Sequence, residues 1–205
     1  MDLDSLLPAL HPLQLEEEEL LDLAGGRMAA VSILLRTGAN RKTQLDVLLM
    51  RRANRPGDRW SGQIGLPGGH AEPIDEHLLA TAVRETREEV GVDLKKTASV
   101  LGRLEPIRAK AKGKLIPMWI VPFVFRATEP IQPHLGPEAA EAFWLPLDQA
   151  RAGHLDSSHT YRAPQANFHM PAWKFEERIV WGLTYEILSG LNRLFDRLER
   201  NEEAP

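Results

Sequence analysis

The stretch LPGGHAEPIDEHLLATAVRETREEVGV, residues 66–92, decides the fold of this chain. After its Pro-Gly-Gly turn, residues 77–90 contain neither Gly nor Pro. Gly91 follows at a position where helices commonly end. The pattern predicts a helix over residues 77–90. It is preceded by a turn in which Gly68 and Gly69 let the backbone approach other groups closely, because glycine has no side chain.

Three glutamates lie on this predicted helix. At roughly 100° per residue, Glu85 and Glu89 lie one turn apart on a flank of the apolar stripe, with Glu88 slightly further round. Like charges at this spacing repel each other, and a hard divalent cation such as Mg2+ relieves the repulsion because it binds carboxylate oxygens. A solvated face is the alternative explanation for such charges, but the Pro-Gly-Gly turn upstream favours a metal site. The stripe itself is predicted to contain Leu79, Val83, Thr86 and Val90.

Composition limits the class of protein. The 205 residues suit one domain with a full core, and 43% hydrophobic and 26% charged residues are typical of a globular protein. A net charge of −4 predicts no general attraction for nucleic acid or anionic membranes. The absence of cysteine excludes disulfides and thiolate metal sites. With no signal peptide and no apolar run of spanning length, we expect a cytoplasmic protein, or one from another reducing compartment.

The remaining elements predict an α/β protein. Residues 28–35 and 45–50 read as a strand hairpin, residues 98–104 and 115–125 as two strands joined by a basic loop, and residues 143–145 as a short strand. A polar stretch then runs to about residue 173. We predict one domain over residues 1–205, with a short N-terminal helical extension (about 1–25, its helix near 14–23) and a long amphipathic C-terminal helix (about 177–200).

The 66–92 stretch resembles the Nudix box, G-x5-E-x7-R-E-U-x-E-E-x-G-U, in which U is a bulky apolar residue. Its spacer is one residue longer than usual, so either Asp75 or Glu76 occupies the first acidic position. The resemblance implies an α/β/α sandwich with a mixed β-sheet. It also implies a hydrolase that splits diphosphate linkages of nucleoside derivatives with Mg2+ or Mn2+, held by Glu85, Glu89 and Glu88.

Two further segments are similar to the coenzyme A pyrophosphatase branch of this family. They are LLMRRA followed by WSGQIGLPGG, within residues 48–69, and IVWGLTYEIL, residues 179–188. The implied reaction converts coenzyme A or its derivatives into 3′,5′-ADP and 4′-phosphopantetheine. Such a substrate needs cations beside its phosphates. The candidates for substrate binding are Gly68, Gly69, Arg51, Arg52, Arg59 and Lys112, although basic residues on loops also serve solubility.

The general base is expected outside the box. Residues 136–147, GPEAAEAFWLPL, resemble the family stretch that supplies it, so Glu138 is the first candidate and Glu141 the second, while Glu88 remains a candidate within the box. Two other functions compete with coenzyme A hydrolysis. One is a Nudix pyrophosphatase for a dinucleotide or an ADP-sugar, and the other is a non-catalytic Nudix regulator that binds a nucleotide. The expected partner is a small nucleoside diphosphate, and the C-terminal leucine stripe allows a homodimer.

Overall fold

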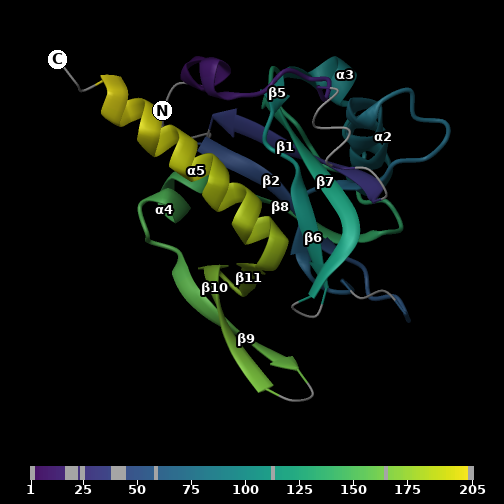
Figure 1. Ribbon diagram of the computed structural model, residues 1–205, viewed down its shortest axis with the longest axis vertical. Coiled ribbons are helices and arrows are strands. Elements are labelled where there is room, and N and C mark those ends of the chain that lie inside the picture. The colour runs from purple at the N-terminus through teal and green to yellow at the C-terminus, as the bar shows by residue number, and fades with distance from the viewer. Residues whose placement is uncertain are drawn as a thin grey trace.

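The computed structural model describes residues 3–16, 23, 26–37, 45–57, 60–111, 114–163 and 166–202. Within these residues an eight-stranded mixed sheet lies between two helices, α2 (Leu78–Val90) and α5 (Gly182–Glu202). Figure 1 shows α5 crossing one side of this sheet, while α2 packs on the other. The predicted α/β/α sandwich with a mixed sheet is therefore confirmed.

The central path of the sheet runs β3-β2-β1-β7-β5, with β4 beside β1, β6 beside β7 and β8 beside β2. The pairing of β1 with β7 is parallel and the other pairings are antiparallel. The strands are β1 (Arg27–Thr37), β2 (Leu45–Arg52), β3 (Ile64–Gly65), β4 (Gly68–His70), β5 (Ala98–Arg103), β6 (Ile107–Ala111), β7 (Lys114–Ala127) and β8 (Ala139–Pro146).

A second, three-stranded sheet projects from this body at the bottom of Figure 1. It contains β9 (Asp156–Ala163), β10 (Ala166–Phe175) and β11 (Arg178–Trp181). The described residues also contain three short helices, η1 (Asp4–Ala9), α3 (Leu94–Thr97) and α4 (Leu147–Arg151). None of the helices in the described part of the chain combines the length and apolarity needed to cross a membrane.

Alternation along the strands divides the core into two layers. On β2, Val47 and Leu49 pack with Leu188 and Leu191 of α5. Their neighbours Leu48 and Met50 pack with α2 and β7 on the other face, in a cluster that includes Ala82, Val90 and Phe123. Consecutive residues of β2 therefore point to opposite faces of the sheet. Arg51 and Arg52, at the end of β2, also point to opposite faces.

The C-terminal helix begins later than predicted. Residues 178–181 form strand β11, in which Ile179 pairs with Lys174 of β10, and the helix starts at Gly182. The β-branched and aromatic side chains of this segment suit a strand. Gly182 has φ 64°, a left-handed conformation that separates strand from helix. The predicted helix over residues 177–181 is wrong, whereas the helix over 182–200 is confirmed.

The other predicted elements agree with the structure only in part. The predicted strands at 28–35, 45–50, 98–104, 115–125 and 143–145 are all present. The basic loop before β7 is partly strand, because β6 pairs with β7. The polar stretch before residue 173 forms the β9–β10 hairpin, which sequence periodicity did not reveal. The helix predicted near 14–23 lies mainly outside the described residues, and residues 14–16 are not helical.

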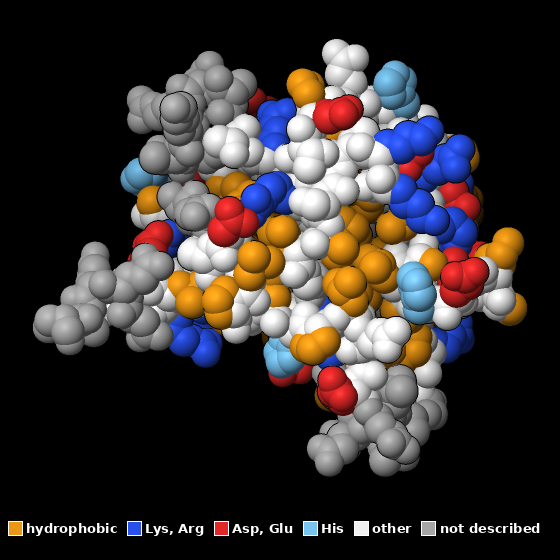
Figure 2. Space-filling model, turned by 90° about the horizontal axis from the view of Figure 1, so that it is seen from above, with side chains coloured by type: hydrophobic (Ala, Val, Ile, Leu, Met, Phe, Trp, Pro, Cys, Tyr) orange, Lys and Arg blue, Asp and Glu red, His pale blue; other side chains and the backbone are white. Residues whose placement is uncertain are grey.

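The molecular surface mixes apolar and charged patches. Figure 2 shows apolar side chains near the middle of the face seen from above, with basic and acidic side chains along its edge. The N-terminal segment contributes exposed leucines, because Leu7 is 46% and Leu13 38% exposed. Scattered apolar exposure of this kind is normal for a folded protein.

Candidate metal and catalytic site

Helix α2 carries the three box glutamates and has well-formed ends. The ring Nδ1 of His77 accepts a hydrogen bond from the Ala80 N–H at 3.0 Å, which caps the first turn. At the other end Gly91 has φ 67° and donates its N–H to Arg87 O. A Cβ atom at Gly91 would lie 2.7 Å from His134 O, so space as well as conformation requires glycine. The predicted helix is confirmed, with its cap at His77.

The Gly-Gly turn brings backbone directly against the glutamates. The Gly68 N–H donates to Glu89 Oε2 at 2.9 Å. A Cβ atom at Gly69 would lie 2.4 Å from Glu85 Oε1, which is closer than any real side chain could come. Gly68 has φ 152°, and its own Cβ would lie 2.3 Å from Ala30 O. Gly68 is therefore required by its conformation and its backbone neighbours, whereas a side chain at Gly69 would displace the Glu85 carboxylate.

The carboxylates of α2 share a crowded environment. The Glu89 side chain is 1% exposed. Burial raises the pKa of Glu89 to about 7, and the negative charges of Glu85 and Glu138 add to this effect, while the Gly68 N–H and Arg52 oppose it. Burial also raises the pKa of Glu85, opposed by Arg84. Glu88, by contrast, is 57% exposed. A bound cation would stabilise such a cluster, because its positive charge offsets the cost of burying the carboxylates and the repulsion between them.

The buried stripe of α2 differs from its prediction. Thr86 and Val90 are buried as expected, but Leu79 and Val83 are only half-buried. Ala82 and Glu89 are buried in their place. Thr86 also does more than pack by its methyl group, because its hydroxyl donates to Ala82 O and lies 2.5 Å from Ser32 Oγ on β1.

The two candidates for the first acidic position have different surroundings. Asp75 Oδ1 lies 2.9 Å from Arg84 Nε, and its Oδ2 lies 2.9 Å from Arg84 Nη2. This two-point contact lowers the pKa of Asp75 to about 2. Arg84 Nη1 then reaches Glu85 at 3.0 Å and Glu88 at 3.1 Å. Asp75, through Arg84, is thus linked to the box glutamates.

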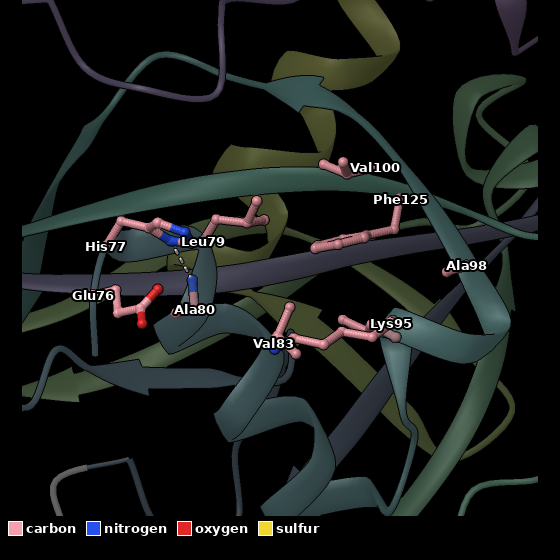
Figure 3. Close-up of a pocket in the computed structure, with 10 residues that line it drawn as sticks. Glu76, His77, Leu79, Ala80, Val83, Lys95, Ala98, Val100 and Phe125 are labelled. Carbon is pink, nitrogen blue, oxygen red and sulfur yellow. Dashed lines mark hydrogen bonds between the residues drawn. The ribbon is translucent and has the colours of Figure 1, made fainter. Parts of the chain in front are cut away.

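Glu76 instead borders a shallow cavity of about 240 Å³ on the other flank of α2. Figure 3 shows the apolar side chains of Leu79, Val83 and Phe125 among its lining residues, with Glu76 and His77 toward one end and Lys95 toward the other. Helical spacing puts this flank on the far side of the buried stripe from the three glutamates. Glu76 therefore lies away from the site, and Asp75 fits the first acidic position.

The loop before β8 brings Glu138 to the same site. The N–H of His134 donates to Val90 O and that of Gly136 donates to Glu89 O, both at 2.8 Å, so the loop caps the end of α2. A Cβ atom at Gly136 would lie 1.8 Å from Glu88 O, which only glycine avoids. Glu138 is 42% exposed and its carboxylate lies 3.0 Å from Arg55 Nη1. This position beside the glutamates and open to solvent suits a residue that meets a substrate.

Arg51 and Arg52, adjacent at the end of β2, point to opposite faces of the sheet. Arg52 Nη1 lies 3.2 Å from Glu89 Oε1, and Arg52 Nη2 lies 3.7 Å from Glu138 Oε2. Arg51 Nε instead lies 3.1 Å from Glu141, which also contacts Arg178 of β11. Hydrogen bonds from Arg178 and Arg51 lower the pKa of Glu141. The structure therefore brings Arg52 and Glu138 to the box glutamates, and not Arg51 or Glu141.

Two predicted substrate residues, Arg59 and Lys112, lie outside the described residues. The nearby Lys110 forms an ion pair with Glu186 of α5 at 2.9 Å. Among the described residues, no three His, Asp or Glu side chains already stand in the arrangement of a metal site. Arg52 and Arg84 occupy the carboxylates instead. The donor set, two largely buried glutamates beside an exposed one and a glycine turn, nevertheless fits a hard divalent cation.

Sequence reasoning did not identify several residues that build this site. The contacts by which His134 and Gly136 cap the end of α2 were not predicted, although a Gly-Pro pair before Glu138 is a turn signal. Ser32 could not have been found, since its contact with Thr86 depends on how β1 packs against α2.

Comparison with known proteins agrees with this architecture. Residues 26–166 match the NUDIX domain family. The chain is 32% identical over 149 residues to an uncharacterized Nudix hydrolase, NudL, of Photorhabdus laumondii, a match that covers 70% of this chain and 74% of that one. A NudL protein of Yersinia pestis is 32% identical over 146 residues, covering 71% of this chain and 70% of that one.

Among solved structures, a Nudix hydrolase from M. smegmatis, RenU, superposes with a TM-score of 0.50 and 18% identity. The superposition covers 87% of this chain and 88% of RenU, which supports the fold. The matched region contains the whole of α2, the glycine turn and the loop before β8. The chain therefore belongs to the Nudix family and is a Nudix hydrolase.

Proposed function

We propose that this Nudix hydrolase cleaves the diphosphate linkage of coenzyme A or its derivatives and releases 3′,5′-ADP and 4′-phosphopantetheine. The observation that carries the proposal is the meeting of Glu85, Glu89 and Glu138 beside the glycine turn, with Arg52 and Arg55 next to them. Carboxylates suit a divalent cation and a proton acceptor, while arginines suit phosphate oxygens.

Glu85 and Glu89 would hold Mg2+ or Mn2+, with Glu88 as a further ligand or a partner through water. Nudix hydrolases generally use divalent metal ions. When bound, such an ion neutralises the diphosphate and lowers the pKa of water beside it. Gly68 and Gly69 leave room for the substrate to approach the glutamates, because any side chain at Gly69 would displace Glu85.

Glu138 is the general base in this proposal. Its carboxylate is accessible to solvent and lies on a loop fixed to the end of α2, so it can remove a proton from the attacking water. Glu141 does not suit this role, because Arg51 and Arg178 hold it on the opposite face of the sheet. Glu88 is the alternative base within the box.

The choice of coenzyme A rests on the two segments that resemble the coenzyme A branch. They lie against each other in the fold, since the Thr184 hydroxyl donates to Ile64 O at 3.1 Å in a buried contact. Ile64 belongs to the segment before the glycine turn, and Thr184 belongs to the IVWGLTYEIL segment at the start of α5. The two segments therefore pack together beside the glycine turn.

The test is a competition among substrates. Purified protein is incubated with coenzyme A, NADH or ADP-ribose and with Mg2+ or Mn2+, and products are identified by mass. We expect the highest kcat/KM with coenzyme A. A higher kcat/KM with NADH or ADP-ribose would assign the chain to the dinucleotide or ADP-sugar pyrophosphatases. Tight nucleotide binding without cleavage of any of them would indicate a regulator.

A further inference from the structure

The Arg52 side chain connects two carboxylates that come from separate parts of the chain. Its Nη1 contacts Glu89 of α2 at 3.2 Å, and its Nη2 lies 3.7 Å from Glu138 of the loop before β8. The two carboxylates repel each other, and the guanidinium is a positive charge shared between them. Arg52 therefore links Glu138 to Glu89, while Arg55 is a second ion-pair partner of Glu138 at 3.0 Å.

The backbone of Arg52 is fixed on both sides. Its N–H donates to Gln63 O at 2.9 Å, and the next N–H, from Ala53, donates to Glu138 O at 2.8 Å. The loop with Glu138 is thus attached to the end of β2 by backbone as well as side chain. Because 27% of the Arg52 side chain is exposed, a ligand can also reach it from solvent.

Both oxygens of Glu89 already accept a hydrogen bond. Oε2 accepts from the Gly68 N–H at 2.9 Å, and Oε1 accepts from Arg52. The Gly68 contact belongs to the rigid glycine turn, whereas the Arg52 contact comes from a long side chain with several rotatable bonds. A cation that binds Glu89 therefore displaces or weakens the Arg52 contact first.

Arg84 differs from Arg52 in this respect. Arg84 also contacts box glutamates, but it donates two hydrogen bonds to the Asp75 carboxylate and one, from Nη2, to His70 O at 3.0 Å. These contacts do not involve Glu89 and keep Arg84 in place. Arg84 therefore shares Glu85 with the proposed cation, whereas Arg52 is the one of the two that shares the buried Glu89.

We propose that Arg52 is a positioning residue that competes with the divalent cation for Glu89 and keeps Glu138 directed at the site. This inference rests on the metal site of the proposed function. We expect a substitution of Arg52 to have opposite effects on metal affinity and on turnover, which a purely structural arginine would not produce. Removing the Arg52 charge tightens metal binding, because a competitor and a repelling charge are lost. It also slows turnover, because Glu138 keeps its contact with Arg55 but loses the contact that directs it toward Glu89.

The experiment measures Mn2+ affinity directly, from the electron paramagnetic resonance signal of free Mn2+, in the absence of substrate. The Arg52→Gln variant is expected to bind Mn2+ about five-fold more tightly than the wild type, the upper range for one partly exposed ion pair. Its kcat with saturating Mn2+ and coenzyme A falls about ten-fold or more. The Arg52→Lys variant keeps the charge but reaches only one carboxylate, so its affinity lies between the two.

Arg51→Gln is the matched control, since Arg51 is the neighbouring residue and pairs with Glu141 on the opposite face. It should leave Mn2+ affinity unchanged. Glu89→Gln tests the site itself and should lose tight binding. If Glu89→Gln loses Mn2+ but Arg52→Gln binds it no more tightly than wild type, the inference is wrong and the metal site stands.

If Glu89→Gln binds Mn2+ as well as the wild type does, the proposed metal site fails and the inference fails with it. Thermal unfolding of each variant shows whether it folds. Should Arg52→Gln not fold, Arg52→Lys decides: an affinity above that of the wild type supports the competition, and an equal or lower affinity overturns it.

Discussion

Arg51 and Arg52 are neighbours in sequence, yet they belong to two different charge clusters. Arg52 joins Glu89 and Glu138 on the α2 face, where burial and like charges raise carboxylate pKa values. Arg51 joins Glu141 and Arg178 on the α5 face, where two guanidinium groups lower the pKa of one carboxylate. The first cluster has an excess of negative charge that a cation can relieve, whereas the second is already neutralised. The cluster on the α2 face is therefore the proposed metal site, whereas the cluster on the α5 face is a set of ion pairs.

The largest loss of kcat is expected when a box glutamate is substituted. Glu85→Gln and Glu89→Gln should each lower kcat by roughly a hundred-fold or more, on the scale of other groups that stabilise transition-state charge. Glutamine keeps the shape of the side chain but removes the charge that a cation needs. Steady-state rates at saturating Mn2+ measure the loss, and circular dichroism checks the fold. Rates near wild type in either variant would remove that residue from the metal site.

Glu138 on the loop before β8 and Glu141 on β8 give the next largest contrast in kcat. Glu138→Ala should lose kcat by about a hundred-fold, in the range of a general base, while Mn2+ affinity changes little. Glu141→Ala should keep most of the activity, because Glu141 lies on the other face. The reverse pattern would move the base to Glu141. If neither variant loses kcat, Glu88 becomes the base.

A smaller effect concerns the 3′-phosphate, which distinguishes coenzyme A from dephospho-coenzyme A. A charge-assisted contact is worth about 1.5–3 kcal/mol, so kcat/KM for coenzyme A should be about ten-fold higher or more. The preference should shrink as salt rises. Arg59→Gln and Lys112→Gln test which predicted cation makes the contact. Equal kcat/KM for both substrates at low salt would argue against either residue and favour a general ADP-linked substrate.

The smallest effects are on stability, and they have opposite signs on the two faces. Glu89 has a raised pKa of about 7 in the folded protein, so its ionisation costs stability as pH rises from about 4.5 through 7. Glu141 has a lowered pKa, so its stabilising effect is present above the unfolded value and disappears as pH falls. With EDTA present, Glu89→Gln should gain Tm relative to wild type between pH 5 and 8, by a few degrees.

Glu141→Gln should lose Tm relative to wild type at pH 7, and the two proteins should converge in acid. Thermal unfolding followed by circular dichroism across this pH range measures both differences. Parallel pH profiles for the two variants would show that the clusters do not differ in the way described.

The sequence predicted the box helix and the group of glutamates because each depends on local spacing, whereas the mixed sheet was predicted from the resemblance to the Nudix family. A helix without Gly or Pro and a pair of glycines are readable from neighbouring residues alone. The separation of Glu138 from Glu141 was not predicted, because the sequence indicated a strand only over residues 143–145, whereas β8 begins at Ala139 and Arg178 of β11 contacts Glu141. The start of α5 was misplaced because residues 178–181 fit a helical pattern but pair with β10.

The central claim is that the α2 face, and not the α5 face, holds the metal. A crystal structure with Mn2+, using anomalous scattering to locate the ion, tests it most directly. We expect an anomalous peak about 2 Å from carboxylate oxygens of Glu85 and Glu89, with Arg52 moved away from Glu89. A peak beside Glu141, or none near Glu85 and Glu89 at saturating Mn2+, would contradict the account.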